Sequence, residues 1–426
     1  MSDMKPSQEL LQYVPQMTLA ERDRRWNATR KAMAEEGLDC LLLWGNDLFW
    51  DMGMVNVRYL THIGSKMHAF VVFPLKGEPI VFSGLPHTNR PFSIYRSTQN
   101  WVTDIRVNLG ISQVADSVKE IGYEKARIGI VGFGTTLVPD NVTYKEYTTL
   151  LQQLPNATFV RATDLVERQR VIKSNEEIAM LERAGKIAYE TIQTMIGSAR
   201  PGVRECELYA NIVHTQISKG CEPIIFHLMH SGPATAPLSD GFLQHLVHGV
   251  EQPASPTMRP LGKDDLVVTE FHTSWAGYMV AAEFSIYLGK APKELHRIHD
   301  VAVECFYSGI EKMRPGVTCR ELWEAFRRPS DKAGMDYVEL GFHGHGLASP
   351  EYPSVTYKSR EAPMLTGDAL GDVVLQENMV FGTNIDMFDP NWRVDVGIML
   401  GDTIQVTKDG PRRLINTPME FPQNPV

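Results

Sequence analysis

The segment Arg200-Pro201-Gly202-Val203 occurs twice in the chain, the second time as Arg314-Pro315-Gly316-Val317, 114 residues later. The dipeptide Glu207-Leu208 recurs as Glu321-Leu322 at the same displacement. Each copy stands between two stretches with helical periodicity and is followed by an extended stretch. The repeat of helix, turn, helix and extended segment predicts a domain with two similar halves.

Histidines follow each half of this repeat. The first half runs into His227-Leu228-Met229-His230-Ser231-Gly232, and the second runs into His343-Gly344-His345-Gly346. Two related halves usually place a site in the groove between them, so these histidines are candidate functional residues. The flanking glycines would let a ligand approach the imidazole of His345, which makes it the first candidate for proton transfer.

Residues 1–168 have a different pattern and are expected to form a separate, smaller α/β domain, with the repeat domain spanning 169–426. A helical stretch from Leu19 precedes the apolar run of residues 39–44. Further apolar runs predict strands at Ala69–Phe73, Ile80–Phe82, 127–133 and 157–161. In the second domain, Ser174 with Glu177 forms a capping-box pattern that predicts the start of a long helix.

Composition limits the function classes. Lys and Arg number 42 against 51 Asp and Glu, a net charge of −9 that disfavours a nucleic-acid partner. No apolar run approaches the ~18 residues of a membrane span, and the first residues lack a signal-peptide core. The 5 cysteines include no CxxC pair, so neither a disulfide framework nor a zinc ribbon is expected. A reducing, cytoplasmic location is the simplest expectation.

The second domain resembles the creatinase/aminopeptidase P/methionine aminopeptidase superfamily, which has the pita-bread fold. The resemblance covers residues 171–426 well and the N-terminal domain more loosely. It is carried by the opening segment, the two RPGV turns, the GHG motif and the last strands: Ile172-Lys173-Ser174, Gly277-Tyr278, Gly344–Gly346, Asn378-Met379-Val380-Phe381 and Asp402-Thr403. It implies an α+β pita-bread domain with two pseudo-symmetric halves.

Metallopeptidases of this superfamily hold two metal ions through two Asp, one His and two Glu. The resemblance places these five positions on Glu270, Ala281, His345, Asn384 and Gly401. Alanine and glycine offer no side-chain ligand, and asparagine has lost the charge. A dinuclear site and any other cofactor are therefore not expected, although a single ion on Glu270 and His345, helped by Asp386, is an alternative.

The local pattern is most similar to the metal-free creatinase-like branch, in which a glutamate after Gly-Tyr binds substrate. That glutamate corresponds to Glu283. Because side chains alternate along a strand, Glu283 is expected to share one strand face with Ala281 and Ser285. Creatinase also has a histidine shortly after a Ser-Gly pair. Here Ser231-Gly232 lacks one at that spacing, and His230, His245 and His248 are the candidates instead.

The sequence hypothesis is thus a metal-independent, creatinase-like enzyme. It would cleave a C–N bond in a small, partly apolar or aromatic non-peptide by His/Glu acid–base catalysis. Catalytic roles are assigned to His345, Glu283, His230 and His248. The substrate-binding assignments are Glu270, Phe271, Tyr278, His343, Asn384, Asp386, Arg58 and Lys66.

Three alternatives stay open. The first is a metal-free lyase that releases a small fragment such as formaldehyde by C–C cleavage. The others are an atypical metal-dependent Xaa-Pro peptidase and a non-catalytic binding protein. Nothing in the sequence separates hydrolase from lyase. The resemblance also implies a homodimer in which residues 56–68 of one chain, with Arg58 and Lys66, reach the site of the other.

Overall fold

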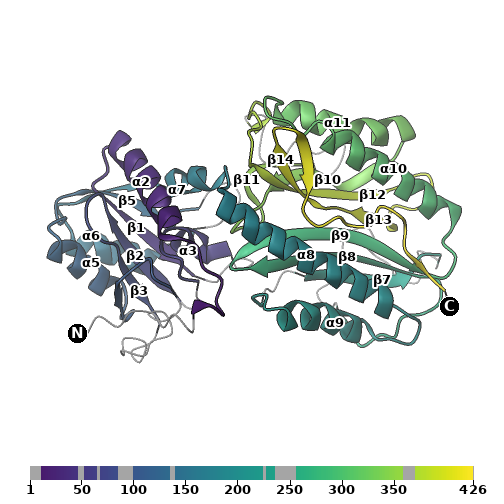
Figure 1. Cartoon of the computed structure of the whole chain (residues 1–426), viewed down its shortest axis with the longest axis horizontal. Helices are drawn as coiled ribbons and strands as arrows, with labels where there is room; N and C mark the ends of the chain where they lie inside the picture. Colours follow the sequence, from purple (N-terminus) through teal and green to yellow (C-terminus); the bar gives the residue numbers. More distant parts are fainter. Residues whose placement is uncertain are drawn as a thin grey trace. The chain divides into compact units, whose positions relative to one another are not determined.

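The computed structural model describes residues 11–46, 52–64, 68–84, 99–134, 140–223, 227–235, 256–357 and 370–425. The chain divides into two compact units, Met1–Arg170 and Val171–Val426. Figure 1 shows the elements of both units. Among the described residues, no helix is long and apolar enough to cross a membrane.

The first unit is built on a mixed six-stranded sheet with the order β4-β3-β2-β1-β5-β6. Strand β1 pairs antiparallel with β2 and parallel with β5, and β2 and β3 form an antiparallel pair. The strands are β1 Cys40–Gly45, β2 Ala69–Pro74, β3 Ile80–Ser83, β4 Asp104–Arg106, β5 Arg127–Val131 and β6 Thr158–Arg161. The strands predicted in this domain are confirmed.

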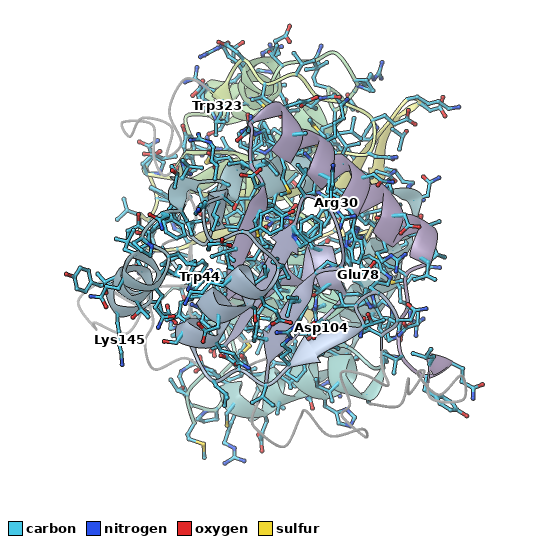
Figure 2. All side chains as sticks on the ribbon, turned by 90° about the vertical axis from the view of Figure 1, so that its left-hand side faces the viewer. Arg30, Trp44, Glu78, Asp104, Lys145 and Trp323 are labelled. Carbon is cyan, nitrogen blue, oxygen red and sulfur yellow. The ribbon has the colours of Figure 1, made fainter. Side chains whose placement is uncertain are left out.

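Helices cover this sheet on both faces, which explains why its central strands are continuous apolar runs. The helices are α2 Leu19–Glu35, α3 Val55–Thr61, α5 Ile111–Glu120, α6 Tyr144–Gln153 and α7 Thr163–Arg170. Trp44 belongs to the apolar cluster that includes Leu150 of α6, whereas Trp26 of α2 packs edge-on against Phe73, with ring centroids 5.9 Å apart. In Figure 2, Trp44 lies inside this unit and Lys145 points outward.

The second unit contains two sheets. One has the order β16-β9-β8-β7, and the other has the order β11-β10-β12-β14-β15 with β13 paired to β12. The strands are β7 His227–Pro233, β8 Asp265–Trp275, β9 Tyr278–Leu288, β10 Asp336–Gly344, β11 Glu351–Tyr357, β12 Val380–Phe388, β13 Gly397–Leu400, β14 Thr403–Thr407, β15 Gly410–Arg413 and β16 Gln423–Asn424. Two helices accompany each sheet: α8 Asn175–Ser198 and α9 Glu205–Ser218, then α10 Lys293–Ile310 and α11 Cys319–Ala333.

The predicted internal repeat is confirmed in the backbone. Gly202 and Gly316 adopt φ angles of 92° and 93°, a conformation that favours glycine. The N–H of Gly202 donates to the carbonyl of Leu261 at 2.8 Å, and that of Gly316 donates to Leu375 at 2.9 Å. The acceptors are also 114 residues apart, so the two halves share their turns and the partners of those turns. The predicted capping box of Ser174 and Glu177 is present at the start of α8.

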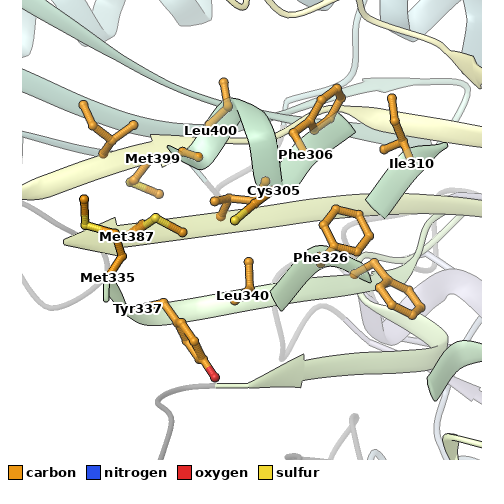
Figure 3. Packing of buried hydrophobic residues seen from close by; sticks show 14 of the residues in the cluster. Cys305, Phe306, Ile310, Phe326, Met335, Tyr337, Leu340, Met387, Met399 and Leu400 are labelled. Atoms are coloured by element: carbon orange, nitrogen blue, oxygen red, sulfur yellow. The ribbon is translucent and has the colours of Figure 1, made fainter. Parts of the chain in front are cut away.

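A large apolar core lies between helices α10 and α11 and the strands β10, β12 and β13. Figure 3 shows Cys305 and Phe306 of α10 packed among Leu340, Met387 and Leu400. Because side chains alternate along a strand, Met387 on this face implies that Asp386 points to the opposite face. The helices therefore hold one face of the second sheet and leave its polar side chains turned toward the other.

Candidate functional site

The first pair of acidic residues is set by the hairpin of β8 and β9. Glu270 lies directly opposite Glu283, and His272 lies opposite Ala281. Directly opposed residues of antiparallel strands share a sheet face, so both carboxylates and the imidazole are on one side. The exposed fractions of Glu270, His272 and Glu283 are 5%, 3% and 1%. Buried polar groups of this kind require partners.

Strand β12 supplies the partners of Glu283. The amide Nδ2 of Asn384 donates to its Oε1 at 2.5 Å, and the backbone N–H of Ile385 donates to its Oε2 at 3.3 Å. Gly401 bridges the sheets as well, because its N–H donates to the carbonyl of Glu283 at 2.9 Å. Glu283 thus joins the two sheets of the second unit through its backbone and its carboxyl group.

Burial raises the pKa of Glu283 well above its usual range, and the negative charges of Asp386 and Glu270 add to this effect. The ionised form is costly in a site that already holds other carboxylates. Glu283 is therefore protonated at pH values where an exposed glutamate is charged. A neutral carboxylic acid can donate a proton or a hydrogen bond, which an ionised carboxylate cannot do.

A second group of side chains is organised around Ser349, which follows the GHG motif. Its hydroxyl lies 3.0 Å from Nε2 of His345 and 3.4 Å from Nε2 of His272. The same nitrogen of His272 is 3.3 Å from Oε1 of Glu270, which links this group to the two acids. The ring of His343 stacks on that of His345 with centroids 4.7 Å apart. We call these residues, with Glu283, Asn384 and Asp386, the polar cluster.

Burial lowers the pKa of His345 well below its usual range, and the neighbouring His343 and His272 contribute in the same direction. Burial also lowers the pKa of His343. Both imidazoles are therefore neutral at physiological pH. The cluster therefore combines a neutral carboxylic acid, Glu283, with two neutral imidazoles, which are groups that can donate and accept a proton.

The pKa of Glu283 leads to a stability prediction. The folded chain holds this proton more tightly than the unfolded chain. The contribution of Glu283 to the free energy of unfolding is therefore fully present below its unfolded pKa of 4.5, and it is lost as pH rises toward the pKa of the folded state. Glutamine does not ionise, so the Glu283→Gln variant does not lose stability in this way as pH rises. We expect the melting temperature of the variant, relative to the wild type, to rise from pH 5 to pH 8. A difference that is constant over this range would contradict the prediction.

The five positions that the resemblance links to metal binding do not form a metal-holding set. The methyl group of Ala281 and the backbone of Gly401 supply no side-chain ligand. A Cβ at position 401 would lie 2.2 Å from the carbonyl oxygen of Thr383 and 2.9 Å from Oε2 of Glu283. The Thr383 carbonyl and the Glu283 carboxyl group therefore leave no room for a side chain at position 401. Among the described residues, no group of three or more His, Cys, Asp or Glu side chains is arranged to hold a metal ion.

Several predicted site residues lie outside the polar cluster. Phe271 points to the other face of β8, where its ring packs against Phe284 with centroids 6.1 Å apart. The hydroxyl of Tyr278 donates to Oε1 of Glu177 at 3.0 Å, which ties it to α8. These two side chains stabilise the unit and do not line the cluster. Strand alternation separates Phe271 from Glu270.

The other predicted residues are distributed as follows. His230 is buried on β7 opposite Val268, on the same face of that sheet as Glu270. Arg58 lies on α3 of the first unit, where it helps to lower the pKa of His62 after the larger effect of burial. Lys66, His245 and His248 lie outside the described residues.

Sequence reasoning missed two members of the cluster, His272 and Ser349. The alternation that placed Ala281, Glu283 and Ser285 on one face would have found His272, two residues after Glu270. No comparable signal existed for Ser349. It lies between β10 and β11, and only the folded chain brings it to His272, 77 positions away.

Comparison with known proteins places the chain in a family. Residues 179–408, more than half of the chain, match metallopeptidase family M24, and residues 25–172 match the creatinase/prolidase N-terminal domain. The chain belongs to metallopeptidase family M24. The two-domain architecture with a C-terminal pita-bread domain is thereby confirmed.

Individual M24 relatives agree with this assignment. An uncharacterised peptidase of Bacillus subtilis is 25% identical over 92% of this chain and 98% of its own length. A Xaa-Pro dipeptidase of Pyrococcus horikoshii is 25% identical over 70% of this chain and 77% of its own. A Xaa-Pro dipeptidase structure from Bacillus anthracis superposes with a TM-score of 0.71 and 22% identity, covering 94% of this chain and 99% of that one; this likeness shows the fold.

The family assignment corrects the sequence hypothesis of a metal-independent enzyme for a small non-peptide. M24 is a family of metallopeptidases, and curated relatives are Xaa-Pro dipeptidases. The hypothesis took the altered residues Ala281, Asn384 and Gly401 as evidence for a change of reaction class. The comparisons support a hydrolase of peptides instead, and they do not support the lyase alternative.

Proposed function

We propose that this chain is a peptidase that hydrolyses the bond before proline in short peptides. The proposal rests on the M24 assignment together with curated relatives that are Xaa-Pro dipeptidases. The polar cluster supports it because it offers the two groups that amide hydrolysis needs, a proton donor and a proton acceptor. Water must lose a proton to attack the carbonyl carbon, and the proline nitrogen must gain one to leave.

Each group of the cluster has a role in this proposal. The Ser349 hydroxyl occupies the lone pair of His345 Nε2, so the proton of the attacking water reaches this neutral imidazole through that hydroxyl. Water gives a hydrogen to Oγ as Oγ gives its own to Nε2. Glu283 is protonated and supplies the proton for the departing nitrogen. The Oδ1 atom of Asn384 is buried and has no hydrogen-bond partner among the described residues, so it can accept an N–H of the peptide.

The test is hydrolysis of a panel of dipeptides by purified full-length protein. Ala-Pro, Leu-Pro and Phe-Pro are compared with Ala-Ala and Leu-Gly, and the released amino acids are quantified. Each assay is run on chelator-treated protein and again with added Mn²⁺, Co²⁺ or Zn²⁺, so that the metal dependence implied by the family is measured in the same experiment. Cleavage confined to the proline peptides supports the proposal. The proposal would be refuted if none of the peptides were cleaved under any of the metal conditions.

We also propose that the active form is a homodimer in which the N-terminal domain of one chain completes the site of the other. The resemblance to creatinase-like proteins is the support for this arrangement, and residues 56–68 are the segment concerned. Light scattering at micromolar concentration should give twice the chain mass of 47.9 kDa. Arg58→Ala should raise KM more than it lowers kcat. A fully active monomer would overturn both expectations.

A further inference from the structure

The hydroxyl group of Ser349 contacts two imidazoles of the polar cluster at the same time. It lies 3.0 Å from Nε2 of His345 and 3.4 Å from Nε2 of His272. Ser349 itself is 3% exposed, so solvent does not readily replace either contact. A serine hydroxyl has one hydrogen and can donate to only one of these nitrogens. The geometry therefore restricts which nitrogen of each ring carries its proton.

The tautomer of His345 follows from its other nitrogen. Nδ1 lies 3.4 Å from the backbone carbonyl oxygen of Met279, which can only accept a hydrogen bond. Nδ1 therefore carries the proton, and Nε2 presents a lone pair. Ser349 donates its hydrogen to that lone pair. The opposite tautomer would bring the Nδ1 lone pair against the carbonyl oxygen and leave the hydroxyl hydrogen without this acceptor.

The tautomer of His272 follows in turn. Because the hydroxyl hydrogen of Ser349 points to His345, its oxygen can only accept from His272. Nε2 of His272 also lies 3.3 Å from Oε1 of Glu270, which is another acceptor. Both contacts need a hydrogen on Nε2 of His272, and its single hydrogen is shared between Oγ of Ser349 and Oε1 of Glu270. One assignment is therefore compatible with all four interactions. His272 then faces Ser349 and Glu270 as a donor, and His345 faces Ser349 as an acceptor.

We propose that the Ser349 hydroxyl, together with the Met279 carbonyl and Oε1 of Glu270, fixes His345 in the Nδ1–H tautomer and His272 in the Nε2–H tautomer. The kinetic part of this inference rests on the proposed peptidase function, in which the proton of water reaches Nε2 of His345 through this hydroxyl. The structural part does not depend on any substrate. Ser349→Ala removes the donor to His345 and the acceptor from His272 while adding no new group.

The experiment uses full-length protein labelled with ¹⁵N-histidine, because the ¹⁵N shifts of the two ring nitrogens report the tautomer directly. In the wild type, we expect Nε2 of His345 to have an acceptor shift and Nε2 of His272 to have a donor shift, with His345→Gln and His272→Gln assigning the signals. In Ser349→Ala, both signals should move toward tautomer averaging, and Ser349→Thr should restore them. Unchanged shifts of both histidines in Ser349→Ala would overturn the proposal.

A matched control separates this role from the loss of any buried hydroxyl. Ser330 is fully buried, and its hydroxyl donates to the carbonyl of Met335 in the helical core. Ser330→Ala should leave the His345 and His272 shifts unchanged, and the melting temperatures of both variants establish that they fold. If proline dipeptides are substrates, Ser349→Ala should lower kcat by about 10- to 100-fold with little change in KM. Absence of peptide hydrolysis would refute the proposed function and leave the NMR result standing.

Discussion

Replacing His345 by alanine, or Glu283 by glutamine, is expected to lower kcat/KM for a proline dipeptide by ~10²–10⁴-fold. His345 is the neutral imidazole whose Nε2 lone pair is held in place by Ser349. Glu283 is the buried acid that both sheets contact, through the amide of Asn384 and the N–H of Ile385. Each change removes one proton-transfer group and retains the strand that carries it.

The test is to measure kcat/KM of each variant on a chromatographic fraction of one oligomeric state. Melting curves of the same fractions check that the variants are folded. His299 is a suitable control because it is also buried, stacks on Phe421 with ring centroids 5.0 Å apart and lies outside the polar cluster. His299→Asn should change kcat/KM only a few-fold. Rates near wild type in both His345→Ala and Glu283→Gln would exclude these residues from the mechanism. Loss in Glu283→Gln alone would make His345 structural.

The fold could be predicted from the sequence because its signals are local. The apolar run at Cys40–Gly45 is a strand covered on both faces, and covered strands need no polar alternation. The RPGV repeat was informative because Gly202 and Gly316 occupy positive-φ positions that strongly favour glycine. The two copies of this four-residue motif were therefore enough to indicate a domain with two similar halves.

The site was only partly predictable, since it depends on contacts between distant segments. Strand alternation placed Glu283 on the face where the polar cluster lies. Phe271 was assigned to substrate binding, but its ring packs against Phe284 on the other face of β8. Ser349 could not be found, because its role depends on a loop that folds back onto β8. The reaction class was wrong for a related reason: Ala281 and Gly401 show which ligands are missing, but missing ligands do not identify a substrate.

The loop that carries Ser349 is anchored by a buried ion pair, and breaking that pair should cost ~3–5 kcal/mol of unfolding free energy. Nζ of Lys173, just before α8, lies 3.0 Å from Oε2 of Glu351, and both side chains are 2% exposed. Oε1 of Glu351 accepts from the backbone N–H of Ala348 at 3.0 Å. Lys173→Met would leave this carboxylate buried with its countercharge removed.

Calorimetry of full-length Lys173→Met should show the transition of the second unit lowered by on the order of 10 °C. Lys219 provides the matched control, because it forms an ion pair with Glu190 in the same unit. That pair is not buried: the side chains of Lys219 and Glu190 are 36% and 48% exposed. Lys219→Met should change stability by less than ~1 kcal/mol. The double variant Lys173→Met/Glu351→Leu should recover most of the loss, since it removes both buried charges. A loss in Lys173→Met no larger than that in Lys219→Met would show that the pair does not anchor the loop. If Lys173→Met and the double variant lost the same unfolding free energy, removal of the unpaired Glu351 carboxylate would have restored no stability. The loss would then be assigned to the packing of the Lys173 side chain.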